Sequence, residues 1–191
     1  MPSLILASTS RYRQELLARL RLPFEAVAPD VDETPLPGEA PAALAERLAL
    51  AKARAVAATR PGAVVLGSDQ VADLDGQALG KPGTHAGAQA QLRRMSGREV
   101  VFQTAVAVVA PGLAAIERAE VRVRFRELSD AAIDAYLHAD QPYDCAGSAK
   151  VESLGIALLE AVVSDDPTAL IGLPLIRTCN LLRRAGLEPL A

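Results

Sequence analysis

Val64-Val65-Leu66-Gly67-Ser68-Asp69-Gln70-Val71 is an apolar run that leads into polar side chains, and the turn-forming pair Pro61-Gly62 precedes it. A run of this length is typical of a strand buried on both faces. A buried helix has the same apolar character, but the preceding turn favours the strand. Such a strand presents Ser68, Asp69 and Gln70 at its carboxyl edge, where open α/β sheets bind ligands. A carboxylate buried there requires a partner or a metal ion, whereas an Asp that caps a turn does not, so this stretch leaves both interpretations of Asp69 open.

Composition argues against several classes of function. The chain has 191 residues, 50% of them hydrophobic, which is enough for a substantial core and unlike a disordered chain. A net charge of −3 and the absence of Trp argue against binding to a nucleic-acid polymer. No apolar run approaches the ~18 residues of a membrane span and no secretory leader is evident, so we expect a cytoplasmic protein without membrane association. Cys145 and Cys179 form no disulfide or metal-ligand pattern and are expected to be small core residues.

Lysine is rare in this chain, and each lysine has a distinctive setting. Of 20 basic residues, only Lys52, Lys81 and Lys150 are lysines. Lys retained in an Arg-rich sequence suits a role that needs a compact ammonium group, such as a phosphate contact. Lys52 falls on the apolar stripe of a predicted helix over 41–59, so it requires a partner or a ligand unless its ammonium group reaches the surface. Lys81 lies in Gly80-Lys81-Pro82-Gly83, which suits either a positioned charge or an ordinary turn.

Two further segments have the composition of ligand-binding loops. A predicted strand over 3–7 is followed by Ser8-Thr9-Ser10 and a helix over 11–20, for which the last serine is a good N-cap. The free N–H groups of such a helix terminus favour an anion, although a capped helix with solvated arginines has the same pattern. The segment 29–35 holds three carboxylates between two prolines, among them Glu33, and suits either a Mg²⁺ site or a surface loop.

The remaining patterns alternate between strands and helices. We expect strands over 24–28, 71–74, 77–79, 99–109, 114–126 and 156–163, and helices over 84–95, 130–139 and 175–185. Asp75-Gly76 is a hairpin signal between two of these strands. A loop of small residues over 143–152 contains Lys150 and Glu152. This order predicts an α/β protein without an internal repeat or a linker.

Seven short motifs follow one another over nearly the full length of the chain: Ala7-Ser8-Thr9-Ser10-x-x-Arg13, Val31-Asp32-Glu33, Lys52-Ala53, Gly67-Ser68-Asp69-Gln70, Gly80-Lys81-Pro82, Cys145-Ala146-Gly147 and Leu170-Ile171-Gly172-Leu173-Pro174. Each is weak alone, but in this order they resemble the Maf-type nucleoside triphosphate pyrophosphatases. The resemblance implies a single domain over 1–191, with a mixed, twisted α/β sheet flanked by helices and two lobes around a central cleft, similar to the inosine triphosphatases. The family often has Pro where this chain has Arg11.

The resemblance also implies an activity. Members of the family hydrolyse the α–β phosphate bond of a nucleotide, release a monophosphate and diphosphate, use a divalent metal ion (Mg²⁺ or Mn²⁺) and are often homodimers. Matched motif by motif, the positions here assign substrate binding to Ser8 and Arg13, catalytic charge neutralisation to Lys52 and Lys81, metal binding to Glu33 and Asp69, and the role of proton acceptor to Asp69. Asp69 as base, as metal ligand or as both are all compatible with the pattern.

Branches of the family differ at three positions, which correspond here to Tyr12, Gln70 and Glu152. The branch that acts on dTTP and UTP usually has Arg and Thr at the first two, whereas an aromatic residue and Gln match the branch that acts on 7-methyl-GTP. The 7-methylguanine base is cationic, so an aromatic face attracts it, and Glu152 can accept from N1 and N2 of guanine. The alternative is that Tyr12 packs at the rim of the cleft and Glu152 is solvated, so that neither contacts the base.

We therefore expect pyrophosphatase activity on 7-methyl-GTP, yielding 7-methyl-GMP and diphosphate, with Tyr12, Gln70 and Glu152 among the substrate-binding residues. The alternatives are a dTTP/UTP pyrophosphatase of the same family and a non-enzymatic regulator of septum formation in cell division. The expected partners are the nucleotide and a second copy of the chain.

Overall fold

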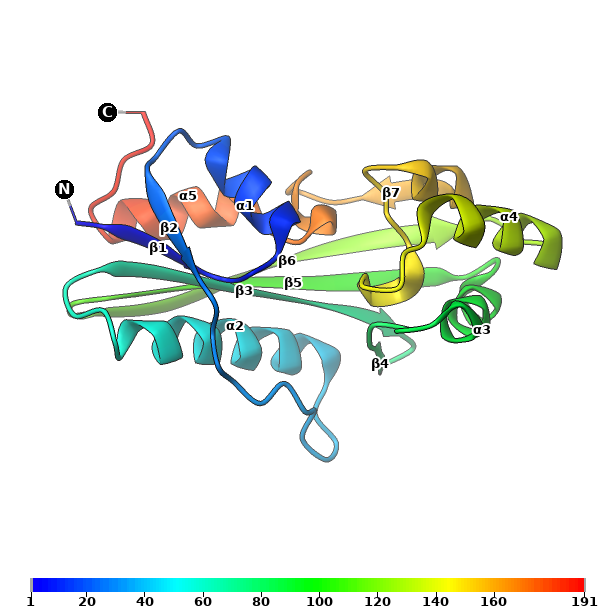
Figure 1. Cartoon of the computed structure of the whole chain (residues 1–191), viewed down its shortest axis with the longest axis horizontal. Coiled ribbons are helices and arrows are strands. Elements are labelled where there is room, and N and C mark those ends of the chain that lie inside the picture. Colours follow the sequence, from blue (N-terminus) through cyan, green and yellow to red (C-terminus); the bar gives the residue numbers. More distant parts are fainter. Residues whose placement is uncertain (1, 191) are drawn as a thin grey trace.

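The computed structural model describes residues 2–190 (Figure 1). Its strands are β1 (Leu4–Ala7), β2 (Phe24–Val27), β3 (Val64–Leu74), β4 (Gln77–Leu79), β5 (Glu99–Ala110), β6 (Leu113–Phe125) and β7 (Leu159–Val163). Its α-helices are α1 (Arg11–Ala18), α2 (Pro41–Ala57), α3 (His85–Met95), α4 (Asp130–Asp140) and α5 (Leu175–Arg184). Three 3₁₀ turns, η1 (Ala146–Ser148), η2 (Leu154–Leu158) and η3 (Ala169–Ile171), complete the described elements.

The strands form one mixed, seven-stranded sheet in the order β2-β1-β3-β5-β6-β7, with β4 paired to β3. Strand β1 is parallel to β2 and β3, and every other described pairing is antiparallel. The long strands β3, β5 and β6 run along the long axis of the molecule in Figure 1. They connect a lobe built on β1, β2, α1, α2 and α5 to a lobe that contains β4, α3, α4 and β7.

Helix α2 covers one face of the sheet in the first lobe, and α1 and α5 cover the other (Figure 1). Successive residues of β3 point to opposite faces, so Leu66 packs with α1 and α5 while Val65 packs with α2. Gly67 lies so close to α2 that a Cβ at this position would be 2.3 Å from the backbone oxygen of Ala49. Only glycine allows this approach, which brings the middle of α2 against the middle of β3.

The second lobe has its own apolar cluster, which α3 and α4 close from outside. Leu92 of α3 and Leu137 of α4 are fully buried against Phe102 and Phe125 of β5 and β6. Thr84 and Ser129 cap the two helices with side-chain oxygens that accept from backbone N–H groups, so the predicted helix over 84–95 begins one residue later, at His85.

The predicted end of the central strand is wrong. The strand continues to Leu74 instead of stopping near residue 68, because β5 pairs with it from Val65 to Asp73. Its parallel neighbour β1 is the strand that stops, at Ala7 opposite Gly67. Asp69 therefore lies within a strand, at the point where the sheet loses one neighbour and the chain of β1 turns away.

Most other predicted elements match to within a few residues. The turn at Asp75 and Gly76 has φ values of 53° and 79°, the left-handed conformations that a tight hairpin requires. The predicted strand over 156–163 is shorter, because residues up to Leu158 form the 3₁₀ turn η2 and pairing begins at Leu159. Among residues 2–190, no helix combines the length and the apolar character needed to cross a membrane.

Candidate active site

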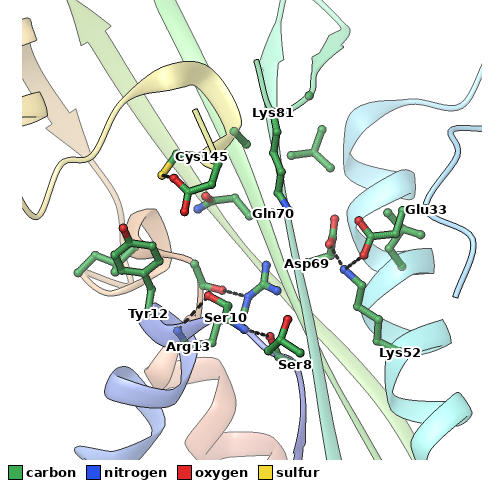
Figure 2. A pocket seen from close by; sticks show the side chains of 18 of the residues that line it. Ser8, Ser10, Tyr12, Arg13, Glu33, Lys52, Asp69, Gln70, Lys81 and Cys145 are labelled. Atoms are coloured by element: carbon green, nitrogen blue, oxygen red, sulfur yellow. Dashed lines mark hydrogen bonds and ion pairs between the residues drawn. The ribbon is translucent and has the colours of Figure 1, made fainter. Parts of the chain in front are cut away.

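A cleft of about 920 Å³ lies between the two lobes and is lined by elements from both. From the first lobe come the loop after β1, the start of α1, the loop after β2, and α2. The second lobe contributes β4 with the loop that follows it, and the segment 144–152. Figure 2 shows Tyr12 and Cys145 on one side of this cleft and Glu33 and Lys52 on the other.

Lys52 binds two carboxylates at once. Its Nζ lies 2.6 Å from Asp69 Oδ1 and 2.7 Å from Glu33 Oε1. Lys52 and Asp69 are buried, at 4% and 7% exposure, whereas the Glu33 side chain is 53% exposed. The apolar stripe of α2 carries Lys52 inward, and the alternation along β3 turns Asp69 toward it, so the buried charge has the partner that it requires. The interpretation of Asp69 as a turn cap is therefore wrong.

Glu33 is held in the charged form. Its partial burial acts to raise the pKa, but the hydrogen bond and charge of Lys52, with the charges of Lys81 and Arg13, outweigh this effect and lower the pKa below its ordinary value. A negative charge at this place is therefore maintained to lower pH than in a free glutamate.

The start of α1 forms a turn rich in donors. Ser10 Oγ accepts from the backbone N–H of Arg13 at 3.4 Å, and Ser10 N donates to the buried Ser8 Oγ at 3.1 Å. The N–H groups of Arg11 and Tyr12 open the helix, where no intrahelical acceptor exists for them. Burial lowers the pKa of the Arg13 guanidinium, while the nearby charges of Asp69 and Glu33 act in the opposite direction and favour its charged form. This wall of the cleft suits an anion.

The opposite face of β3 holds the turn that follows η3. Gln70 Nε2 donates to Ala169 O at 2.9 Å and Leu170 O at 3.0 Å. Gly172 O accepts from both Ser68 Oγ at 3.1 Å and Arg13 Nε at 3.0 Å. The amide nitrogen of Gln70 is therefore engaged by the fold, and only its carbonyl oxygen is left for a ligand.

Sequence reasoning missed Thr104 and Gly172 as supports of the site. Thr104 Oγ1 accepts from Gln70 Nε2 at 3.0 Å and donates to Ala169 O at 2.9 Å. Gly172 has φ 124° and holds the Arg13 side chain through its carbonyl oxygen. The motif Leu170–Pro174 marked the position of Gly172, but an isolated Thr in a long apolar strand has no signal of its own.

Tyr12 and Glu152 line the same corner of the cleft, together with residues of the loop over 144–150. Burial raises the pKa of Tyr12, so the phenol stays neutral, and the Arg11 guanidinium lies 5.3 Å from the centre of its ring. Cys145 lines this corner rather than the core, and burial raises the pKa of its thiol to about 12. The prediction that both cysteines belong to the core is therefore wrong, since Cys179 is also only half-buried.

Lys81 is exposed in the loop after β4 and reaches toward the centre of the cleft (Figure 2). Within residues 2–190 it forms no ion pair, in contrast to Lys52. All residues assigned from the sequence line this cleft: Ser8, Tyr12, Arg13, Glu33, Lys52, Asp69, Gln70, Lys81 and Glu152. Their proximity is established, whereas their chemical roles stay predictions.

The two carboxylates of the cleft fit a hard cation. Lys52 contacts one oxygen of each, and no described residue donates a hydrogen bond to Asp69 Oδ2. Carboxylate oxygens are the ligands that Mg²⁺ and Mn²⁺ prefer, usually one or two of them together with water and substrate phosphate. Glu33 and Asp69 are accordingly the residues that would hold such an ion here.

The chain is similar in structure to a HAM1 protein from Coxiella burnetii, with a TM-score of 0.52 at 19% identity over 67% of this chain and 75% of that one. This likeness concerns the fold alone, and it confirms the expected fold class, a mixed α/β sheet of the inosine-triphosphatase type.

Sequence similarity reaches much further. Proteins named 7-methyl-GTP pyrophosphatase from Albidiferax ferrireducens and Bordetella pertussis are 66% and 64% identical to this chain, covering 98% and 99% of it and 95% of each relative. A protein of the same name from Polaromonas sp. is 68% identical over 96% of this chain and 84% of its own length. A sequence profile described as Maf-like protein matches residues 3–185. The chain therefore belongs to the Maf family.

Proposed function

We propose that this chain is a nucleotide pyrophosphatase that cleaves the α–β phosphate bond of 7-methyl-GTP and releases 7-methyl-GMP and diphosphate. The observation that carries the proposal is the buried Lys52–Asp69 pair in a cleft whose facing wall is the donor-rich start of α1. The names of the relatives support the same substrate. We further propose that residues 1–191 act as one domain, in the cytoplasm and as a homodimer, which light scattering would test.

The proposed phosphate-binding groups come from the start of α1 and from the loop after β4. Arg11, Tyr12, Arg13 and Lys81 all line the cleft, and they offer the two free N–H groups of the helix start, a guanidinium and an ammonium group. Hydrolysis of a phosphate anhydride needs positioning and neutralisation of charge more than covalent chemistry. Ser8, buried beneath this turn, keeps it in shape by accepting from Ser10 N.

Asp69 is the proposed proton acceptor for the attacking water. It is the most buried carboxylate of the cleft, and Lys52 keeps it oriented at 2.6 Å. Glu33 and Asp69 would hold a divalent ion, which would supply Lewis acidity for the cleavage. Where no divalent ion is bound, the positive charge of Lys52 between the two carboxylates offsets their mutual repulsion.

Tyr12 and Glu152 are the proposed selectors of the base. The Arg11 guanidinium lies 5.3 Å from the centre of the Tyr12 ring, and the ring face that it leaves open can attract a cationic base. Glu152 is exposed at the same corner and can accept from the N1 and N2 donors of guanine, which thymine and uracil do not present in that pattern. Gln70 contributes its free carbonyl oxygen.

The first experiment measures diphosphate release with Mg²⁺ or Mn²⁺ from wild type and Asp69→Asn. Loss of a general base lowers the rate by roughly 10²-fold or more. Glu160→Gln, an exposed carboxylate on β7 outside the cleft, is the matched control and should keep wild-type turnover. Wild-type turnover in Asp69→Asn would refute the catalytic assignment, and no turnover by wild type on any nucleotide would leave a non-enzymatic role.

The second experiment compares kcat/KM on 7-methyl-GTP, GTP, dTTP, UTP and CTP. We expect 7-methyl-GTP to be preferred over GTP, from which it differs only by a methyl group and the resulting charge. Tyr12→Ala should selectively lower activity on the methylated base, whereas Tyr12→Phe should retain the preference because the aromatic face remains. A preference for dTTP or UTP would overturn the substrate, and an equal loss on all substrates in Tyr12→Ala would make Tyr12 a structural residue.

A further inference from the structure

The two histidines of the chain meet outside the cleft. His85 is the first residue of α3, and Asp134 and His138 lie on α4, which packs against α3. His85 Nε2 is 3.1 Å from Asp134 Oδ1, and His138 Nδ1 is 3.5 Å from Asp134 Oδ2. The two imidazole rings are 5.1 Å apart between their centres. None of the three residues lines the cleft.

The spacing of these groups is close to that of a metal site. One potential ligand atom from each residue lies within 4.8 Å of the other two. Ligands bound at about 2.1 Å to a tetrahedral ion are about 3.4 Å from one another, so only small rotations of the side chains are needed. Asp134 and His138 are four residues apart and share one face of α4, and the His138 side chain is 70% exposed.

The hydrogen bonds around His85 provide an independent argument. Tyr143 donates its hydroxyl proton to Leu137 O at 3.4 Å, which leaves its oxygen to accept from His85 Nδ1 at 3.1 Å. With this tautomer, assigned from the hydrogen-bond network, a neutral His85 presents the lone pair of Nε2 to the Asp134 carboxylate. In this tautomer a metal ion can lie between the two acceptors, whereas in the other tautomer a proton on Nε2 occupies the same contact.

In His138 the nitrogen that faces Asp134 is the one that the backbone engages. Its Nδ1 lies 2.8 Å from the backbone oxygen of Asp134 and is the donor in that contact, which leaves Nε2 with its lone pair. Histidines that bind metals usually donate their second ring nitrogen to a carbonyl, carboxylate or water in this way, because the contact fixes the tautomer and the ring orientation.

We propose that His85, Asp134 and His138 bind one divalent transition-metal ion of the zinc class, at a site separate from the cleft. Two imidazoles and one carboxylate suit Zn²⁺ much better than Mg²⁺, which prefers oxygen ligands only. Three protein ligands leave a fourth position for water.

An ion at this site ties together segments that border the cleft. Tyr143 O accepts from Gly83 N at 3.0 Å, and the hydroxyl of Tyr143 contacts His85. The loop that carries Lys81 therefore runs directly into the site, and so does the start of the loop that lines the base corner. The ion holds the first turn of α3 against α4 and thereby restricts the motion of Lys81.

The test uses the full chain without an affinity tag, stripped of metal by a chelator, and titrated with Zn²⁺ in excess Mg²⁺ by calorimetry. We expect one Zn²⁺ per chain, and Co²⁺ in its place should give the visible absorption of a tetrahedral site. His85→Gln, His138→Gln and Asp134→Asn should each weaken Zn²⁺ binding by at least about 10-fold, since even residues behind the ligands have effects of that size.

Two controls make the result specific. Glu127→Gln removes an exposed carboxylate of the same lobe outside the cluster and should leave Zn²⁺ affinity unchanged. Asp69→Asn should also leave it unchanged, because the cleft is a different site. Zn²⁺ affinity that is the same in wild type and both histidine variants would overturn the proposal, and so would affinity lost only in Asp69→Asn.

Hydrogen exchange on the wild type tests the link to the cleft without any substitution. Saturating Zn²⁺ should slow amide exchange in residues 83–87 and 137–145, which surround the site. Unchanged exchange in both segments would show that the ion does not join α3 to α4 and would overturn the proposed tie.

Discussion

Lys52 holds two carboxylates together in the wall of the cleft, and two of these three charged groups are buried. Buried ion pairs add little net stability, because desolvation offsets their attraction, but removing one partner leaves an uncompensated charge. Asp69, at 7% exposure with Lys52 at 2.6 Å, is such a case. A substitution of Lys52 is therefore expected to affect both the stability of the fold and the chemistry proposed for Asp69.

Lys52→Met should lower the free energy of unfolding at pH 7 by about 3 kcal/mol, because Asp69 loses its counter-charge in a buried position. The double variant Lys52→Met/Asp69→Asn, which removes both charges, should recover most of this loss. Urea unfolding measures the difference. Arg54→Met, at an exposed site two residues further along α2, should change the free energy of unfolding by no more than about 0.5 kcal/mol. A single variant as stable as the double variant would show that the pair is solvated.

At the scale of elements, the loop that carries Glu33 is tied to α2 by a second ion pair. Both oxygens of Glu39 accept from Arg47, at 2.6 and 2.8 Å, and Arg47 Nη2 also donates to Thr34 O at 3.1 Å. Glu39 Oε2 further accepts from Leu36 N at 3.0 Å. This clamp fixes a proline-bounded loop that has no secondary structure of its own, and so keeps Glu33 near Lys52.

The Glu39 clamp should be lost in acid. The hydrogen bonds from Arg47 and from Leu36 N lower the pKa of Glu39 from 4.5 to about 2. Because the folded pKa is the lower one, the stabilisation is fully present above pH 4.5, declines as the pH falls and is gone near pH 2. The stability difference between wild type and Glu39→Gln in urea unfolding should therefore narrow between pH 5 and pH 2.5. In an Arg47→Ala background, Glu39→Gln should change the free energy of unfolding only slightly at every pH. A stability difference between wild type and Glu39→Gln that does not vary with pH would contradict the clamp.

At the scale of the whole molecule, the cleft takes its lining from both lobes, which the long strands β3, β5 and β6 connect. A nucleotide in the cleft contacts both lobes, so binding and global stability are linked. Lys81 enters from the second lobe, is exposed and forms no ion pair within the described chain, so its removal leaves no buried charge behind.

A non-hydrolysable 7-methyl-GTP analogue at 100 times its dissociation constant should raise the free energy of unfolding by about 2.7 kcal/mol. Lys81→Ala should bind the analogue more weakly and show a smaller rise at the same concentration, with an unchanged melting temperature in its absence. Thermal melts with and without the analogue check both statements. Arg126→Ala, an exposed cation outside the cleft, is the control. Equal stabilisation of Lys81→Ala and wild type would remove Lys81 from the phosphate site.

Much of the local structure follows from short-range signals. Ser10, Thr84 and Ser129 cap helices because a side-chain oxygen within three residues satisfies a free N–H group. Asp75-Gly76 forms its hairpin because both residues tolerate a left-handed backbone. The inward position of Lys52 follows from the helical period of α2. The residues that line the cleft were predicted from the seven ordered motifs. The resemblance to the Maf family indicated that these motifs meet in one site, which local sequence patterns do not show.

Only the tertiary structure shows which contacts join segments that are distant along the chain. Asp69 lies within a strand because β1 ends beside it while β5 continues, and a strand cannot be delimited without its neighbours. The amide of Gln70 is taken up by residues 99 and 100 positions further on. His85 and His138 meet because α3 packs on α4. Helix caps and apolar periodicity depend on residues that are near one another in the sequence, so they can be recognised from the order of residues. Contacts between distant segments depend on how whole strands and helices pack, so they cannot.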